Sequence, residues 1–374
     1  MPDAAVLVAK LLFWGSLSTL VWTHALYPSA AAALARVRTR RVRRAEIEPT
    51  VTVTVIVAAY NEEAVIERRL ENLLALDYPA EKLALLVTSD ASTDRTHELV
   101  ERFAPHVRLI VNERGGKVAA QNRAVRETAG EILAFSDANA TWAADALRSL
   151  VQSFADPEVA YACGRLVLQD AAGNNKEGVY WRYELWLRAS ESRLHSVTGG
   201  NGSIYAVRRE DYVEVDPRFG HDLALPYLMV QRGRRAVYEP AALAFEKPTP
   251  SNETEYRRKV RMFEHCWLIA LRGGMLRRLP PVYWVEVVSH RLLRYGSGLL
   301  HLVLLGSSAA LAVLDGAWLW WAALGAQGAL LAAAAAGVGI ARYYVLVTWA
   351  TVVSLWNYLR RGVPATWDAA EGTR

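Results

Sequence analysis

The sequence has only two cysteines in 374 residues, Cys163 and Cys266, and neither has a partner at the spacing of a metal site or a redox motif. It contains no Gly-x-x-x-x-Gly-Lys-Ser/Thr stretch, and the glycine pattern of a dinucleotide site does not follow its first strand-like run. These absences argue against a P-loop ATPase and a nicotinamide-dependent dehydrogenase. The absence of such partners for the two cysteines favours inert thiols in a reducing cytosol.

The chain has no basic strand studded with aromatic residues, the pattern typical of nucleic-acid binding. Its formal net charge is +5 and arginine far outnumbers lysine, but the basic clusters flank the apolar ends of the chain. Arginines in that position favour contact with anionic lipid headgroups. We therefore expect a membrane partner and no nucleic acid.

The N-terminal stretch from Ala4 to Leu26 is mostly apolar, with Lys10 as its only formal charge, and is long enough to cross a bilayer. A cleaved signal peptide is the alternative, because the small residues 29–33 resemble a cleavage site. Basic residues are sparse before this stretch and dense after it, in "ARVRTRRVRR" (35–44). The positive-inside rule therefore predicts an uncleaved anchor and a basic juxtamembrane segment over 1–45. It also predicts that the protein lies in the plasma or inner membrane with the following domain in the cytosol.

Three apolar segments near the other end predict three further spans, at Leu299–Leu314, Trp318–Ile340 and Tyr343–Leu359. The third is ambiguous, because Arg360 and Arg361 would lie outside if all three segments span. Residues 281–298 are expected to form an amphipathic helix on the inner surface. We assign 281–374 to this membrane region and 46–280 to a cytosolic domain.

Strand-like and helix-like stretches alternate between Val51 and Phe154, which is typical of right-handed βαβ units and a parallel sheet. The predicted strands are Val51–Ala58, Leu83–Val87, Val107–Val111 and Ile132–Phe135. Helices are expected after the first three, ending near Leu76, Phe103 and Glu127. Each strand is followed by a polar cluster, and four clusters at corresponding strand ends indicate one site.

The stretch "EILAFSDANATW" (131–142) places Asp137 at the end of a strand and Asn139 two residues later. A carboxylate with a second oxygen ligand at this edge of a sheet suits Mg²⁺ or Mn²⁺. The alternative is that residues 137–141 only cap the next helix.

Groups that suit the rest of a nucleotide follow the other strands. Asp90 can accept hydrogen bonds from a ribose or base, as can Glu62 with Asn61, and Lys117 follows two glycines where it can meet phosphate oxygens. Together with a metal at Asp137, these groups predict a nucleoside diphosphate site.

Five motifs of the sequence resemble those of the family 2 glycosyltransferases, which have the GT-A fold and use nucleotide-sugar donors. They are "VTVIVAAYNEE", "TSDASTDRT", "GGKVAAQNRAV", "FSDAN" and "GHDLALPYLMVQRG", in the family's order over about residues 51–276. With one N-terminal and several C-terminal apolar segments, the chain resembles the membrane-embedded branch that includes poly-N-acetylglucosamine, hyaluronan and cellulose synthases. The resemblance therefore implies a Rossmann-like, mostly parallel GT-A sheet.

The resemblance also implies roles for individual residues. Tyr60 and Glu62 would border the nucleobase, Asp90 would contact the base or ribose, and Lys117 would lie near the donor. Asp137 is the first acid of the metal-binding Asp-x-Asp motif, in which Asn139 replaces the second. Asp222 matches the general base, with His221 in place of the preceding acid.

The sequence departs from the family where processive synthases have Gln-x-x-Arg-Trp, because residues 258–262 are Arg, Lys, Val, Arg and Met. Arg258 and Arg261 are three residues apart and would share a helix face, so they are predicted to clamp the diphosphate. Met262 removes the tryptophan that borders the acceptor sugar in the family. The sequence leaves open whether the acceptor is a growing polysaccharide or a lipid-linked sugar.

One base and no protein nucleophile predict direct displacement with inversion, from a UDP-sugar to a glycan or lipid-linked acceptor. Asn201 in "TGGNGSIYAVRRE" (198–210) and His221 are the candidate sugar or acceptor contacts, although the first stretch also suits a glycine turn before a strand. Two alternatives remain: a nucleotidyltransferase that shares the βαβ core, and a catalytically silent membrane scaffold.

Overall fold

The computed structural model describes residues 2–44, 51–169, 178–249 and 251–366. The chain forms two compact units. The helical unit comprises Met1–Ala30, Asn252–Ala270 and Val285–Gly362, and the α/β unit comprises Ala31–Ser251, Leu271–Trp284 and Val363–Arg374.

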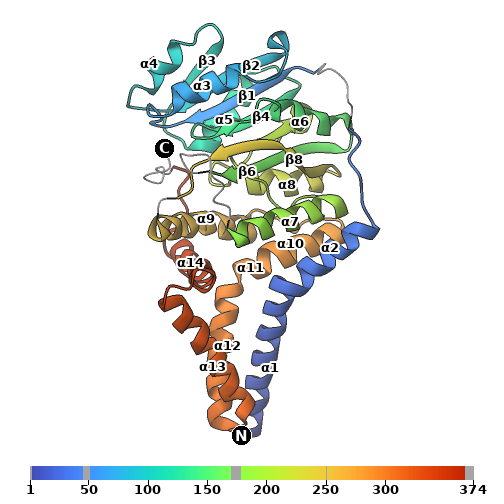
Figure 1. The fold of residues 1–374 in the computed structure, drawn as a ribbon, viewed down its shortest axis with the longest axis vertical. Coiled ribbons are helices and arrows are strands. Elements are labelled where there is room, and N and C mark those ends of the chain that lie inside the picture. Colours follow the sequence, from blue (N-terminus) through green and yellow to red (C-terminus); the bar gives the residue numbers. More distant parts are fainter. Residues whose placement is uncertain (1, 45–50, 170–177, 250, 367–374) are drawn as a thin grey trace. The chain divides into compact units, whose positions relative to one another are not determined.

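The α/β unit is built on an eight-stranded sheet in the order β3-β2-β1-β4-β7-β6-β8-β5. Its first half is parallel, because β1 pairs with both β2 and β4, and β2 pairs with β3 (Figure 1). In the second half β7 runs antiparallel to β4 and β6, and β8 runs parallel to β6. The strands are β1 (Val53–Ala59), β2 (Leu83–Asp90), β3 (Val107–Asn112), β4 (Ile132–Asp137), β5 (Thr141–Trp142), β6 (Val159–Leu168), β7 (Tyr205–Arg208) and β8 (Arg235–Glu246).

All four predicted strands are present, and helices follow the first three as expected: α3 (Ile66–Leu74), α4 (Thr96–Glu101) and α5 (Lys117–Arg126). The central strands are buried on both faces, which explains why they have continuous apolar runs instead of alternating ones. The capping alternative for residues 137–141 is wrong. Thr141 and Trp142 form the edge strand β5, and helix α6 (Ala146–Gln152) begins only at Ala146.

The α/β unit also contains α7 (Val179–Leu194), α8 (His221–Gln231) and short 3₁₀ turns at Ala80–Lys82, Ser153–Ala155 and Arg209–Asp211. One apolar core joins the two halves of the sheet, since Val55 and Val57 of β1 belong to the same buried cluster as Val159 of β6 and Val237 of β8. This shared core holds the carboxyl ends of β1, β2 and β4 at one edge.

The helical unit contains α1 (Pro2–Val21), most of α9 (Asn252–Arg272), α12 (Ser297–Leu314), α13 (Trp318–Ala335) and α14 (Gly339–Arg361). A π-helical turn at Trp22–Leu26 joins α1 to α2 (Tyr27–Val37). Residues 281–295 are helical, as predicted for the interfacial segment, in α10 (Pro281–Val287), a π-helical turn (Val288–Leu292) and α11 (Leu293–Tyr295). Phe13 of α1 packs edge-on against Trp320 of α13, with ring centroids 5.1 Å apart.

Among the described residues, three helical stretches are long and apolar enough to cross a membrane: Asp3–Val37, Ser297–Leu314 and Trp318–Ala335. Two of these stretches lie in the C-terminal region, where about three spans are predicted. The third predicted segment forms the helix α14, which carries Arg342, Asn357, Arg360 and Arg361 and is not among these stretches.

Candidate active site

The predicted donor residues lie at the carboxyl edge of the parallel half of the sheet. Tyr60 directly follows β1, and Asp90 and Asp137 are the last residues of β2 and β4. The strand order reverses between β1 and β4, since the chain winds outward from β1 to β3 and then returns to the other side of β1. The crevice outside the strand ends at such a point is where open α/β sheets bind ligands.

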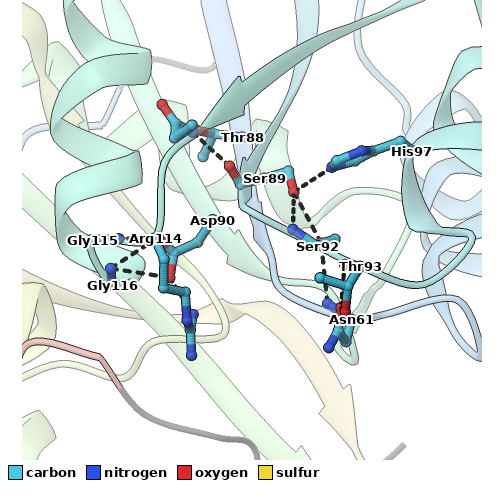
Figure 2. Close-up of polar contacts among 11 residues, drawn as sticks. Asn61, Thr88, Ser89, Asp90, Ser92, Thr93, His97, Arg114, Gly115 and Gly116 are labelled. Atoms are coloured by element: carbon cyan, nitrogen blue, oxygen red, sulfur yellow. Dashed lines mark hydrogen bonds and ion pairs between the residues drawn. The ribbon is translucent and has the colours of Figure 1, made fainter.

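Asp90 is buried and organises the loop before α5 (Figure 2). Its Oδ1 accepts the backbone N–H groups of Gly115 at 2.7 Å and Gly116 at 2.9 Å, and its Oδ2 is bonded to the guanidinium of Arg114. That guanidinium also lies over the Tyr60 ring, with its Cζ 3.4 Å from the ring centroid. Arg114 therefore joins the two groups predicted to contact the base and ribose.

A second polar network fixes the loops after β1 and β2 to each other (Figure 2). Asn61 has a positive φ of 54°, and its side-chain Oδ1 accepts the backbone N–H of Thr93 at 2.8 Å. Its backbone N–H donates to the hydroxyl of Ser92, which is bonded in turn to Ser89. The neighbouring Glu62 N–H donates to the Thr96 hydroxyl. Both loops therefore present their polar side chains from a rigid base.

Asp137 is paired with the ammonium of Lys117, the first residue of α5. Burial lowers the pKa of Lys117, but Asp137 outweighs this effect, with further contributions from Asp222 and Glu246, so that the pKa lies above its usual value. Lys117 is therefore a permanent cation at neutral pH. It stands among three carboxylates, one of which is the predicted general base.

A buried arginine of α3 contacts the neighbours of Asp137 at the end of β4. Arg69 of α3 donates to the Ser136 hydroxyl at 2.8 Å and lies over the Trp142 ring, with its Cζ 4.8 Å from the ring centroid. Burial lowers the pKa of Arg69 to about 9, although Asp137 partly opposes this shift. Ser136 also donates to the backbone carbonyl of Ser203. Asp137 is thus held on a strand end whose neighbouring side chains are fixed.

The residues around Asp137 fit a divalent metal that takes most of its ligands from elsewhere. Oδ2 of Asp137 faces Gly202, where an added Cβ would lie 3.1 Å from that oxygen, so the absence of a side chain leaves this oxygen approachable. Asn139 is partly exposed two residues later. Among the described residues no group of three or more His, Cys, Asp or Glu side chains could hold a metal. A Mg²⁺-type ion held by one or two protein oxygens, with phosphates and water completing its shell, is compatible with this set.

Asp222 lies in the first turn of α8, where the positive end of the helix favours a carboxylate. Its backbone carbonyl accepts the N–H of Gly200 at 2.7 Å, which ties α8 to the loop 198–202. A Cβ at Gly220 would lie 2.7 Å from Asp222 Oδ1, so glycine at 220 leaves room for the carboxylate. Gly202 of the same loop faces Asp137, and the loop therefore links the predicted base to the predicted metal ligand.

His221 points into the core and not toward a ligand. Its side chain is buried, its Nδ1 lies 2.9 Å from the Tyr205 hydroxyl, and its Nε2 lies 3.4 Å from the Tyr212 hydroxyl. Burial lowers the pKa of His221 to about 3, with a smaller contribution from the charge of Lys117. The imidazole is therefore neutral, and both its nitrogens face tyrosines instead of an acceptor sugar.

Asn201 is also occupied by its own loop. Its Nδ2 donates to the Gly164 carbonyl at 2.7 Å, and its Oδ1 accepts the N–H of Ile204 at 3.0 Å. The side chain is buried and shapes the turn before β7, as the alternative interpretation of this stretch predicted.

Arg258 and Arg261 lie on α9 in the helical unit, one turn apart. Arg258 donates to both carboxylate oxygens of Glu255, at 2.9 and 3.2 Å. Glu255 also pairs with Lys259 at 3.6 Å. The predicted shared face therefore exists, and it carries an acid of its own.

The model of glycosyl transferase family 2 matches residues 54–215, which include every strand-end group described above for the donor. These residues are a family 2 glycosyltransferase domain. Asp222, Arg258 and Arg261 lie beyond the matched residues, and the roles of all the predicted site residues, inside and outside the match, stay predictions.

Several proteins are similar to this chain. A beta-monoglucosyldiacylglycerol synthase from Synechocystis is 31% identical over 216 residues, which cover 53% of this chain and 43% of that protein. A poly-beta-1,6-N-acetyl-D-glucosamine synthase from Staphylococcus aureus is 25% identical over 204 residues, covering 52% and 49%. The chain spans about half the length of the curated relatives it matches.

A mannosyltransferase from Pyrobaculum calidifontis, solved in complex with GDP-Man and Mn²⁺, has a similar fold with a TM-score of 0.70. The likeness covers 96% of this chain and 99% of that one at 24% sequence identity. This neighbour, together with the family model, establishes the GT-A fold that the motifs predicted.

The site contains groups that sequence reasoning missed. The first is Arg114, which directly precedes the two glycines of the motif "GGKVAAQNRAV", but nothing in the sequence links it to Tyr60.

The second group that sequence reasoning missed is the segment Val363–Thr366. A Cβ at Gly116 would overlap the carbonyl oxygen of Ala365 and lie 2.8 Å from its carbon, so this segment contacts the Asp90 loop directly. No sequence motif predicts a contact between residues so far apart in the chain.

Proposed function

We propose that this glycosyltransferase moves a sugar from a nucleoside-diphosphate donor, a UDP-sugar, to a lipid-linked or growing glycan acceptor at a membrane. The transfer would be a metal-assisted direct displacement that inverts the anomeric centre. The observation that carries the proposal is the charge arrangement around Lys117, which is paired with Asp137 and within the influence of Asp222. One cation thus interacts with both the predicted metal ligand and the predicted base.

The donor would lie across the carboxyl ends of β1, β2 and β4. Tyr60 and Arg114 offer a stacked surface for a base, and Asp90 offers carboxylate oxygens to a base or ribose. Because Arg114 already occupies both Tyr60 and Asp90, a nucleotide must insert beside it or displace it. The ammonium of Lys117 would meet phosphate oxygens.

Asp137 and Asn139 would hold Mg²⁺ or Mn²⁺, which supplies charge neutralisation on the departing diphosphate. The Mn²⁺ bound to the mannosyltransferase of similar fold supports this assignment. Lys117 would stabilise the same developing charge. Arg258 and Arg261 would assist if donor binding frees Arg258 from Glu255.

Asp222 would accept the proton of the attacking hydroxyl. His221 beside it serves to position α8, because its ring is buried and faced by Tyr205 and Tyr212. Direct attack by the acceptor without a protein nucleophile gives inversion.

The three apolar helical stretches support an integral membrane protein. The arginines that follow the first stretch support a cytosolic orientation for the catalytic domain. The relatives named as a glucosyldiacylglycerol synthase and a polysaccharide synthase support an acceptor that is either a lipid or a glycan.

The test is to incubate membranes containing the protein with a panel of radiolabelled nucleotide sugars. We expect one UDP-sugar to label material that enters organic solvent or a high-mass polymer, with release of UDP. Asp137→Ala should abolish turnover together with metal-dependent nucleotide binding. Asp222→Asn should lower kcat by ~10²-fold or more with little change in donor affinity, because general-base catalysis contributes on that scale.

Asp145→Ala is the matched control, since Asp145 is an exposed aspartate before α6 with no predicted role in the site. Release of pyrophosphate would identify a nucleotidyltransferase and sink the proposal. Nucleotide binding that a chelator leaves unchanged would remove the metal from it. An Asp222→Asn variant that keeps most of its turnover would show that Asp222 is not the base.

A further inference from the structure

The α/β unit has a second concave site, a pocket of about 270 Å³ lined mainly by arginines. Its walls are formed by Arg40, Arg41, Arg43, Asp156, Pro157, Glu158 and Arg235. It combines the basic segment after the first apolar helix with the turn before β6 and the first residue of β8. None of these residues belongs to the donor site.

The pocket lies at the opposite edge of the sheet from the donor site. Strand β7 is antiparallel to β4 and to β6, so β6 and its parallel neighbour β8 run in the same direction as β4. Asp137 marks the carboxyl end of β4, whereas Glu158 and Arg235 mark the amino ends of β6 and β8. A ligand in this pocket is therefore distinct from the nucleotide.

The basic segment is fixed to the sheet by backbone hydrogen bonds, so the pocket is built before any ligand arrives. Arg235 is buried and donates to the Arg40 carbonyl at 3.1 Å and the Ser192 carbonyl at 3.2 Å. The Arg40 N–H donates to the Arg193 carbonyl, and the Arg43 N–H donates to Asp156 Oδ2 at 3.2 Å. Holding the backbone in this way reduces the conformational entropy lost on binding.

The charge of the pocket is not balanced by its own acids. Four arginines and two acids line it, Arg40 is paired with Glu158 at 3.0 Å, and Asp156 accepts backbone N–H groups. Within the described part of the chain, neither Arg41 nor Arg43 has an ion-pair partner, and both are exposed.

The neighbouring His195 reports the same positive field. Its pKa is lowered to about 4, by burial first and then by the charges of Arg40 and Arg235, which outweigh the opposing charge of Glu158. The carbonyl of His195 accepts a hydrogen bond from Arg235 at 3.2 Å, so the backbone of His195 is tied to a residue that lines the pocket.

We propose that this pocket binds the phosphate group of an anionic membrane phospholipid. A phosphate suits paired guanidinium groups because their N–H donors match its oxygens. Chain connectivity favours a lipid over a soluble phosphate. Arg40 follows Val37 by three residues, within roughly 11 Å of chain reach, and Val37 ends an apolar helical stretch of 35 residues.

The preceding helix α2 supplies the apolar half of such a site. Leu34 and Val37 are 53% and 83% exposed, although both are large apolar residues. Exposed apolar side chains followed within six residues by Arg41 and Arg43 form a surface that complements an acyl chain and a charged headgroup. This inference goes beyond the glycosyl transfer, but it rests on the membrane location proposed above.

The test uses the full chain, delipidated in a neutral detergent, with bound phosphatidylglycerol and phosphatidylcholine counted by native mass spectrometry. We expect selective retention of phosphatidylglycerol by the wild type. Arg41→Ala with Arg43→Ala should weaken that retention about tenfold or more, the scale expected for two lost arginine contacts with a headgroup. Arg41→Lys with Arg43→Lys should keep much of it.

Arg68→Ala with Arg126→Ala removes two exposed arginines from α3 and α5 and is the charge-matched control. Equal losses in the two double alanine variants would show a non-specific charge effect and overturn the site. Inorganic phosphate that binds the wild type as tightly as phosphatidylglycerol would overturn the lipid assignment. Nucleotide binding, measured on the same samples, should be unchanged in every variant, so that failure of the lipid site and failure of the proposed transferase function are distinguishable.

Discussion

Replacement of Gly116 by alanine tests the contact between the loop before α5 and the segment Val363–Thr366. Gly116 has φ 92° and ψ 161°, a region that is essentially restricted to glycine and costs other residues about 1–3 kcal/mol. The new Cβ would also overlap the carbonyl of Ala365. At about 2–4 °C per kcal/mol for a domain of this size, the apparent Tm should fall by roughly 2–12 °C. Nucleotide affinity should fall as well, because the Gly116 N–H holds Asp90.

Gly115→Ala is the matched control, because Gly115 also donates its N–H to Asp90 but does not have a positive φ. A Cβ at 115 would lie 3.2 Å from the Ala119 Cβ, so a small adjustment accommodates it. Thermal unfolding in detergent, followed by intrinsic fluorescence, compares the two. Both substitutions are then repeated in a chain that ends at Gly362, which isolates the overlap with Ala365. In that shorter chain, Gly116→Ala should lower the Tm by less than it does in the full chain. Equal Tm losses at 115 and 116 would refute the reasoning.

Three further outcomes are expected. The pKa of His221 is about 3 in the folded protein, against an ordinary 6.5. As the pH falls, the unfolded chain therefore takes up this proton before the folded protein does. The stability that neutral His221 contributes is complete above pH 6.5 and is lost as the pH drops toward 3. The free energy of unfolding, measured at several pH values, should therefore decline less steeply in acid for His221→Gln than for the wild type. Asn139→Asp should retain or raise Mn²⁺ affinity measured with bound nucleotide, since it restores a charge, and a steep loss would show that Asn139 has another role. In detergent without anionic lipid, Arg258→Ala and Arg261→Ala should lower kcat more than donor affinity, whereas wild-type kinetics in both would favour a headgroup role.

The parallel half of the sheet could be predicted because its signals are local. Val55–Ala59 and Ile132–Phe135 are continuous apolar runs, and polar groups follow them directly in the sequence. The strand-end rule then places Asp90 and Asp137 at one edge without any knowledge of contacts. The donor half of the site follows from these two steps.

The rest of the site depends on contacts that leave no local pattern. Strand β5 is only two residues long, too short for any periodicity, and its partner β8 is about a hundred residues further along the chain. The stacking of Arg114 on Tyr60 and the contact of Gly116 with Ala365 join separate loops. The prediction that His221 contacts a sugar or acceptor rests on its position before Asp222. In the structure its side chain is buried in the core, and the sequence at the start of a helix does not indicate burial.

The pairing of Asp137 with Lys117 bears on how a donor enters the site. The raised pKa of Lys117 keeps it charged, so the charge of Asp137 is already balanced before any ligand arrives. Asn139 adds an oxygen but no negative charge, and a divalent cation arriving alone would therefore meet an ammonium and only a shared carboxylate. A diphosphate brings enough negative charge to attract both the cation and Lys117. Asparagine at 139 would therefore favour binding of the metal–nucleotide complex over the free metal, and Lys117 would leave Asp137 for the phosphates when this complex binds.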